Sequence, residues 1–193
     1  MVILLPRTIR LDASDAVVFA RAAEPGEWAV PGTFLFAGRD PASFSRKEQI
    51  AFRSGFLGVD SFGFSTLVIL QPAGEDEREA MIATLARQLV AHLGAPGEDI
   101  ARPAAEEEVA LAQDLCRGHA ENTLVALHRS LGEDGAIHEQ FRTLKSRDET
   151  AFGAGYLRGH DRAFYIVESD GEDDAGEDGA HHVDLLNLRG QGQ

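Results

Sequence analysis

FSTLVILQ, residues 64–71, is the stretch of sequence that decides the fold. It is nearly all apolar and rich in branched side chains, which is typical of a strand covered on both faces. The next pattern is helical, because apolar residues recur every three or four positions from Ile82 to Leu93 within residues 75–93, just before Gly94. A buried strand followed by an amphipathic helix predicts a mixed α and β protein with this strand central in its sheet.

Upstream of this strand, the chain favours short strands and one helix. RTIRL at residues 7–11, AVVFARA at 16–22 and TFLFA at 33–37 alternate with turns rich in Asp, Pro and Gly. We expect them to form an N-terminal antiparallel meander. Residues 41–56 predict a helix, because a Ser and a Glu near its start, at positions 45 and 48, have the spacing of a capping box.

Eight of the eleven phenylalanines lie between residues 19 and 64, so aromatic side chains are concentrated in the N-terminal third. Each buried ring removes a large apolar area from water, and we therefore expect a packed aromatic core. A pocket for a hydrophobic small molecule is the alternative interpretation.

Downstream, the apolar periodicity predicts a long helix from about Pro103 to Leu131, opened by proline and three glutamates. A shorter helix is expected to carry Ile137, Phe141 and Leu144 on one face. RAFYIVE, residues 162–168, then reads as a strand.

The last part of the chain changes in composition. Seven acidic residues and no basic one lie between residues 168 and 178, so we expect residues 169–180 to form an acidic mobile loop. Residues 181–193 are predicted to supply a C-terminal strand, VDLLNL, and a tail that belong to the same domain as residues 1–168. The chain as a whole is thus predicted to be α+β, with an antiparallel sheet and helices packed on it in a single compact domain over residues 1–168.

The chain is strongly acidic, since 32 Asp and Glu against 18 Lys and Arg give a formal charge of −14. Such a field repels phosphate backbones and anionic membrane surfaces, so no nucleic acid and no membrane is expected as a partner. No apolar run approaches the length of a membrane span, and the N-terminus lacks the features of a signal peptide. A single cysteine, Cys116, fits a cytoplasmic location.

Cys116 and His119 are the pair in the sequence with the most potential for chemistry. In the predicted long helix they lie one turn apart, so a thiolate and an imidazole could bind one metal ion. His138 and His160 are the candidates for further ligands. The alternative is that both residues are structural, with the cysteine packed as a small hydrophobe, because one C-x-x-H supplies too few ligands.

Motifs of several enzyme classes are incomplete in this chain. His138 and Glu139 begin like a zinc-protease motif, but Arg142 stands where the second histidine is required. The acidic segment from Asp170 has Ala175 at the position of the turn glycine of a calcium loop. No P-loop or complete nucleophile elbow occurs. The sequence therefore identifies no catalytic residue.

RTIRLD at residues 7–12, EWAVPG at 27–32, FRSGFLGV at 52–59 and AAEEEVALAQDLC ending at Cys116 resemble an uncharacterised bacterial family of short acidic proteins, classed only as a domain of unknown function. The resemblance carries no catalytic residue over to these positions. Similar proteins accompany redox-enzyme maturation and lipoate-ligase-like proteins, which implies an accessory role.

The leading hypothesis is a non-catalytic cytosolic accessory or binding protein that contacts a protein partner and assists the maturation of a redox enzyme. The alternative is a small metalloprotein or metal-dependent enzyme that uses Cys116 and His119. A carrier of a hydrophobic small molecule is a third hypothesis. No cofactor is expected, apart from the metal ion of the second hypothesis.

Overall fold

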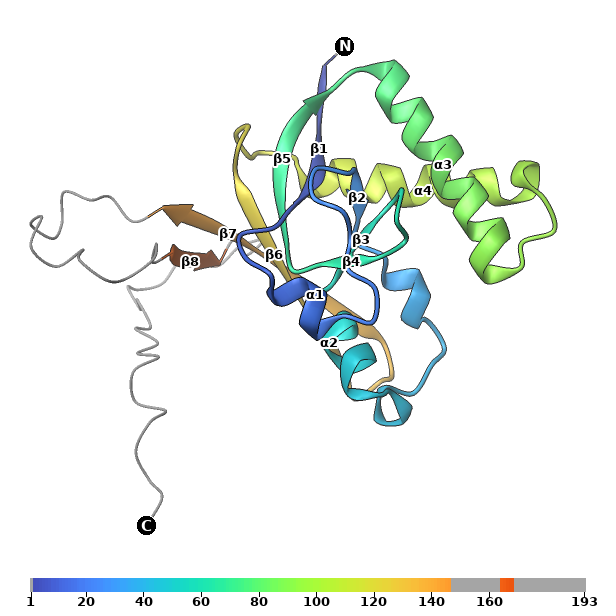
Figure 1. The fold of residues 1–193 in the computed structure, drawn as a ribbon, viewed down its shortest axis with the longest axis horizontal. Helices are drawn as coiled ribbons and strands as arrows, with labels where there is room; N and C mark the ends of the chain where they lie inside the picture. Colours follow the sequence, from blue (N-terminus) through green and yellow to red (C-terminus); the bar gives the residue numbers. More distant parts are fainter. Residues whose placement is uncertain (1, 147–163, 169–193) are drawn as a thin grey trace, which may run out of the picture.

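Two antiparallel sheets form the centre of the fold, and their strands come from both halves of the chain (Figure 1). The computed structural model describes residues 2–146 and 164–168. The larger sheet has the strand order β1-β5-β6-β7-β8, and the smaller sheet has the order β2-β3-β4. The fold is α+β, and the described residues form a single compact domain, as the sequence predicts.

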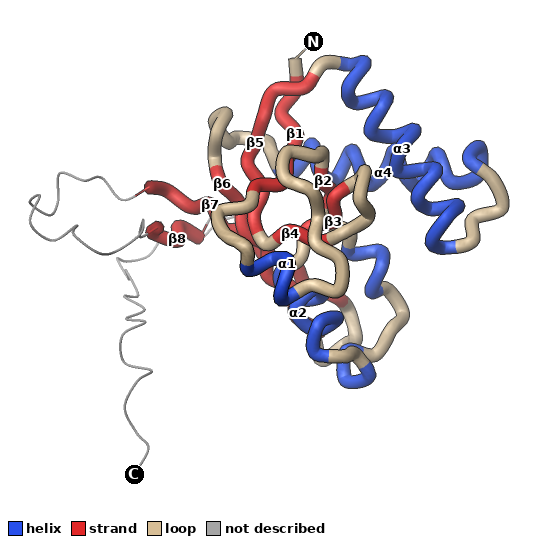
Figure 2. Tube along the Cα trace, viewed as in Figure 1, coloured by secondary structure: helices blue, strands red, loops and turns tan. Residues whose placement is uncertain are grey.

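Figure 2 shows where helices, strands and loops occur along the chain. The strands are β1 (Ile3–Ile9), β2 (Ala29–Val30), β3 (Phe56–Gly58), β4 (Phe64–Ser65), β5 (Leu67–Ala73), β6 (Leu124–Leu131), β7 (Ile137–Ser146) and β8 (Phe164–Glu168). The α-helices are α1 (Ser14–Val18), α2 (Arg46–Ser54), α3 (Glu75–Leu93) and α4 (Glu98–Leu115). Short 3-10 helices occupy Thr33–Phe36 and Pro41–Ser43.

The predicted strand at residues 64–71 is divided between the two sheets as β4 and β5. β5 is an inner strand, but it lies second in the order and not in the middle. Its side chains alternate: Val68 and Leu70 are fully buried, whereas Leu67 and Ile69 are half-buried. The expectation of equal cover on both faces is therefore wrong. The two long helices contact each other, and α4 also contacts β1 and β2, whereas neither helix makes a comparable contact with β5.

The inner face of the larger sheet packs against the smaller sheet. The apolar side chains of this layer belong to both sheets and to the end of α4: Val68, Leu70, Val125, Leu127, Ala29, Phe56 and Cys116. β1 links the two sheets at one edge, because Arg7 pairs with Trp28 immediately before β2. The result is a curved pair of sheets with an apolar layer between them.

The long helices cover the other side of the smaller sheet. Val30 and Leu57 point away from the inner layer and pack against apolar residues of α3 and α4. α3 ends at Gly94, which adopts a left-handed conformation (φ 70°) that glycine tolerates without strain. The predicted helix at residues 75–93 is thus confirmed. In Figure 1, α3 and α4 lie on the right of the sheets, and β7 and β8 extend to the left.

The aromatic residues of the N-terminal third form a core of their own beneath α2. Phe19, Phe36, Phe44 and Phe52 are buried together, and the rings of Phe36 and Phe52 meet edge to face with centroids 5.4 Å apart. The predicted aromatic core is confirmed. α2 begins at a capping box. The Ser45 hydroxyl accepts a hydrogen bond from the backbone N–H of Glu48, and the Glu48 carboxylate accepts one from the backbone N–H of Ser45.

Three sequence predictions are wrong. The N-terminal meander does not form. Residues 16–22 belong to α1 and the loop after it, and residues 33–37 belong to a 3-10 helix and its end. β1 pairs instead with β5. The long helix ends at Leu115, and its expected second half is strand β6. The expected helix at residues 137–144 is strand β7. In the last two cases, strand pairing across the β6–β7 hairpin overrides local helix propensity.

The strand predicted at 162–168 is present as β8. The acidic loop predicted at 169–180, the C-terminal strand and tail at 181–193, and His160 lie outside the described residues. Among the helices of the described ranges, none has the length and apolarity needed to cross a membrane.

Candidate functional site

The proposed metal ligands do not share a helix face. Cys116 is the C-cap of α4, and His119 lies in the turn that follows, where its backbone N–H donates to the Cys116 carbonyl at 3.3 Å. His138 lies on β7 near the hairpin turn, with Asp134 as its neighbour at 3.8 Å. Within residues 2–146 and 164–168, no three His, Cys, Asp or Glu side chains gather closely enough to hold a metal ion.

The surroundings of Cys116 are those of a packed side chain. It belongs to the apolar layer between the sheets, and its thiol donates to the Ala112 carbonyl at 3.2 Å. Burial raises the pKa of this thiol to about 12, so the thiolate that a metal ion or a nucleophilic reaction needs is disfavoured at neutral pH.

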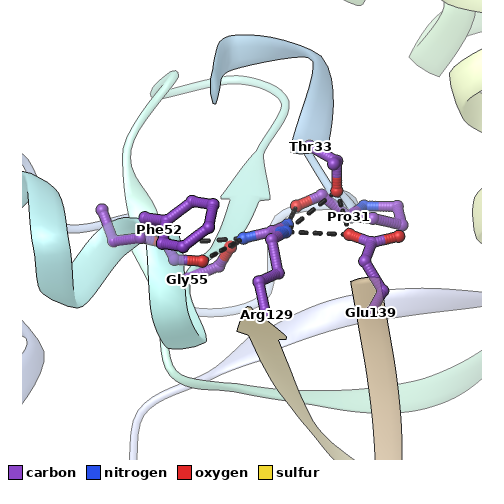
Figure 3. Close-up of polar contacts among 7 residues, drawn as sticks. Pro31, Thr33, Phe52, Gly55, Arg129 and Glu139 are labelled. Atoms are coloured by element: carbon purple, nitrogen blue, oxygen red, sulfur yellow. Dashed lines mark hydrogen bonds and ion pairs between the residues drawn. The ribbon is translucent and has the colours of Figure 1, made fainter. Parts of the chain in front are cut away.

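The most elaborate polar arrangement surrounds Arg129, which sequence reasoning did not single out (Figure 3). Its side chain is fully buried and points inward from β6. Its Nε donates to Thr33 at 2.9 Å and to Glu139 at 2.8 Å. Its Nη1 donates to the backbone carbonyls of Phe52 at 3.1 Å and Gly55 at 3.0 Å, and its Nη2 donates to the carbonyl of Pro31. The complete set of carbonyl acceptors is Pro31, Ala51, Phe52 and Gly55.

This set, which we call the arginine cluster, comprises Arg129, Glu139, Thr33 and those four carbonyls. Because every nitrogen of the guanidinium has at least one acceptor, its charge is neutralised by Glu139 and its donors are used within the protein. The guanidinium is therefore not available to bind a substrate anion. It fixes the loop before α2, the end of α2 and the β6–β7 hairpin to one another.

Glu108 of α4 is the titratable group next to this cluster. Burial raises its pKa to about 7, the negative charges of Glu139 and Glu107 add to that shift, and Arg129 opposes it. One of its carboxylate oxygens, Oε2, is buried without a hydrogen-bond partner. A carboxyl with these properties can take up and release a proton near neutral pH. No second reactive group of the cluster is left for it to act with, because Arg129 and Thr33 are already bonded.

Two other buried carboxylates also have structural tasks. Glu27 accepts from the backbone N–H groups of Asp60 and Ser61 at 2.6 and 2.8 Å, which holds the turn between β3 and β4. Asp15 of α1 accepts from the hydroxyl of Thr66 at 2.5 Å, between β4 and β5. These carboxylates stabilise loops, and we assign neither to chemistry.

A pattern in the sequence could have revealed Arg129. In LVALHRSL, residues 124–131, every second side chain from Val125 to Arg129 is buried, which is the period of a strand and not of a helix. Asp134-Gly135 downstream is a strong hairpin signal, and Gly135 adopts φ 80° in that turn. A charged residue in phase with two buried apolar residues indicates an internal ion pair.

The other side of the larger sheet carries a different feature. Register pairs place Ile69, Leu124 and Leu144 in one row across β5, β6 and β7, and Ile9, Leu67 and Ala126 in the adjoining row. All six side chains are half-buried. None is among the residues that pack against the three apolar clusters of the described chain. We call these six residues the outer face.

The outer face has an unusual charge for so acidic a protein. The outward positions of β1, β5, β6 and β7 carry no Asp or Glu, whereas Arg7 and Arg142 stand at its borders. Arg7 stacks on Trp28 at 4.0 Å and approaches Glu77 at 3.6 Å. The apolar surface thus has basic borders, with Glu77 of α3 near Arg7 and Glu168 of β8 opposite Arg142 in the register.

Comparison with known protein families identifies a matching family. The profile of a family of unknown function, DUF6505, matches residues 3–155. These residues include the arginine cluster, all six residues of the outer face and the whole of α3 and α4. No curated protein and no solved structure gives a significant match.

Proposed function

The chain belongs to DUF6505, which supplies no activity, and we propose on that premise that it is a non-catalytic accessory protein that binds a protein partner through its outer face. The observation that carries the proposal is the row of Ile69, Leu124 and Leu144, an apolar surface on a sheet whose other face is already packed. These side chains are half-buried, and contiguous apolar side chains that stay partly accessible on a folded protein are typical of contact surfaces.

The composition of the outer face supports a protein as the partner. A nucleic acid or an anionic membrane would have to approach a chain with a formal charge of −14, which is electrostatically unfavourable. Aliphatic side chains with arginine at the border instead match the apolar core and polar rim of a protein interface. We propose the cytosol as the location, which fits the single cysteine.

The polar interior supports binding over catalysis. Arg129, Glu139 and Thr33 bond with one another, and Glu27 and Asp15 hold backbone groups. The family resemblance of the sequence suggests an accessory role in redox-enzyme maturation, so we propose a redox enzyme undergoing maturation as the first partner to test.

The test introduces a charge into the outer face. Leu124→Glu is compared with Ser130→Glu, which adds the same charge at an exposed outward position of the same strand. A photo-crosslinking residue at position 128 identifies the partner in cells, and binding is then measured with both purified proteins. We expect Leu124→Glu to weaken binding at least tenfold and Ser130→Glu to leave it unchanged. Equal binding by both variants would exclude the outer face as the contact surface.

Elemental analysis of the purified protein distinguishes the competing metalloprotein hypothesis from the binding function proposed here. Stoichiometric metal that is lost in Cys116→Ala and in His119→Ala would support that hypothesis against ours. Because Cys116 is buried, the folding of both variants has to be checked first by their thermal unfolding.

A further inference from the structure

We propose that Glu108 of α4 and Glu139 of β7 hold one proton between them, and that release of this proton loosens the contact between α4 and the β6–β7 hairpin. This inference goes beyond the proposed function and does not depend on the outer face. Its basis is the set of charges beside Arg129, the hydrogen bonds already made there and a buried oxygen that those bonds leave out.

Three charged side chains lie together where α4 approaches the hairpin. Arg129 is fully buried and pairs with Glu139 at 2.8 Å, so one positive charge balances one negative charge. Glu108 interacts electrostatically with both members of this pair and adds a second carboxylate when it is ionised. The group then has a net negative charge in surroundings with little water. Uptake of one proton by the two carboxylates removes that excess charge.

The hydrogen bonds of the arginine cluster are all made to acceptors other than Glu108. The guanidinium of Arg129 donates to Thr33, to Glu139 and to the four backbone carbonyls. The hydroxyl of Thr33 donates to Glu139. Oε2 of Glu108 is buried and has no hydrogen-bond partner. A proton turns this carboxyl into a donor, and we assign the Glu139 carboxylate as its acceptor, because an arginine offers donors alone.

The charged groups of the other elements packed against α4 form pairs of their own. Glu79 of α3 pairs with Arg102, which lies in the first half of α4. Arg7, the one charged residue of β1, approaches Glu77 of α3 at 3.6 Å. β2 consists of Ala29 and Val30 and contributes no charge. These two arginines are thus paired with carboxylates outside the arginine cluster, and the protonation of that cluster is set by its own members.

The proton is released in the neutral range. Burial raises the pKa of Glu108 to about 7, the negative charges of Glu139 and Glu107 add to that shift, and Arg129 opposes it. Below this pH the protonated carboxyl bonds to Glu139. Above it, two carboxylates face one arginine and repel each other, and the proton has passed to water.

The apolar packing of α4 is directed at other elements than the hairpin. Ala105, Val109 and Ala112 are buried in one cluster with Val30 and Leu57 of the smaller sheet and with apolar residues of α3. The polar contact of Glu108 is therefore a separate junction, which can open while the apolar packing of the helix persists. We expect the response to pH to be local, with the fold intact on both sides of the transition.

The experiment is an NMR titration of the full chain from pH 5 to pH 9 with the glutamate carboxyl carbons labelled. We expect the Cδ signals of Glu108 and Glu139 to move with a common midpoint near pH 7. Relaxation dispersion of the Val109 methyl groups measures the loosening, and their exchange contribution should rise at least twofold between pH 6 and pH 8. The methyl groups of Val68, in the layer between the sheets, serve as the reference and should not change.

Two variants make the test specific. Glu108→Gln keeps a donor but has no proton to release, so both effects of pH should disappear. Glu107→Gln removes the neighbouring exposed carboxylate and is the matched control. It should keep both effects, with a slightly lower midpoint, because the charge of Glu107 adds to the raised pKa of Glu108.

The inference is overturned by a Glu108 midpoint near the ordinary value of 4.5. A midpoint near 7 to which Glu139 does not respond would exclude the shared proton. A common midpoint without any change in the dispersion of Val109 would exclude the loosening of α4. All three outcomes are read from the wild-type chain, so the test stands even if Glu108→Gln fails to fold.

Discussion

At the scale of single residues, Arg129 is the side chain that joins the segment after β2 and the end of α2 to the β6–β7 hairpin. Its guanidinium donates to the carbonyls of Pro31, Phe52 and Gly55 and pairs with Glu139. A buried ion pair gains little over an apolar pair of the same shape, yet removal of one partner leaves an uncompensated charge and unpaired acceptors. The cluster therefore makes the fold sensitive to one position.

We predict that Arg129→Met lowers the free energy of unfolding by about 3–5 kcal/mol, because Glu139 and the carbonyls lose their buried donors. Urea unfolding followed by the fluorescence of Trp28, the only tryptophan, measures the change. Arg117→Met is the matched control, because its side chain is 77% exposed, and it should change stability by less than about 0.5 kcal/mol. Equal midpoints for the two variants would refute the structural role of Arg129.

At the scale of elements, the helix caps are where sequence and structure agree best. The capping box of Ser45 and Glu48 is a local pattern, and both of its hydrogen bonds form at the start of α2. We predict that Ser45→Ala lowers stability by about 1 kcal/mol, because the backbone N–H of Glu48 loses its acceptor. Differential scanning calorimetry should show a midpoint lower by about 2–4 °C. Ser130→Ala, at an exposed strand position, is the control, and a similar shift in it would argue against a capping effect.

The elements that sequence reasoning predicted correctly are those with local causes. α3 has a continuous apolar stripe and a terminal glycine, α2 has its capping box, and β5 and β8 have branched or aromatic runs. The metal hypothesis depended on a helix that continued through Cys116. That helix ends because Gly118 and Asn122 adopt positive φ angles of 77° and 66° in the following turn.

The remainder could not be predicted from local patterns, because it depends on contacts between distant segments. Leu, Ala, His and Arg in β6 are compatible with a helix, and only the pairing with β5 and β7 makes the segment a strand. The arginine cluster joins residues 74–98 positions apart. The outer face likewise becomes visible only when the register of four strands is known.

At the scale of the whole molecule, Glu108 couples stability to pH. Its pKa in the folded protein is raised to about 7 from an ordinary value of 4.5, mainly by burial. Between these values the folded protein holds a proton that the unfolded chain releases, so the stability that this group contributes falls as pH rises from about 4.5 to about 7. Above that range the contribution stays constant.

We predict that Glu108→Gln reduces the loss of stability between pH 5 and pH 8 by about 1 kcal/mol, a value that allows for solvent screening of a half-buried group. Urea unfolding at both pH values measures the difference. Glu121→Gln removes an exposed carboxylate and should leave the pH dependence as it is in the wild type. Parallel pH profiles for wild type and Glu108→Gln would contradict the assignment.

The position of Arg129 in the chain also bears on how the protein is made. The donor that satisfies the Pro31 carbonyl lies 98 residues later in the sequence. A nascent chain that has not yet emerged as far as β6 therefore lacks the donor that Arg129 supplies to the Pro31 and Gly55 carbonyls, and its β1–β5 pair lacks the third strand of the sheet. The N-terminal portion can therefore reach its native structure only after the β6–β7 hairpin has been translated. A chain that terminates before β6 is expected to remain incompletely folded and to be bound by chaperones or degraded by proteases.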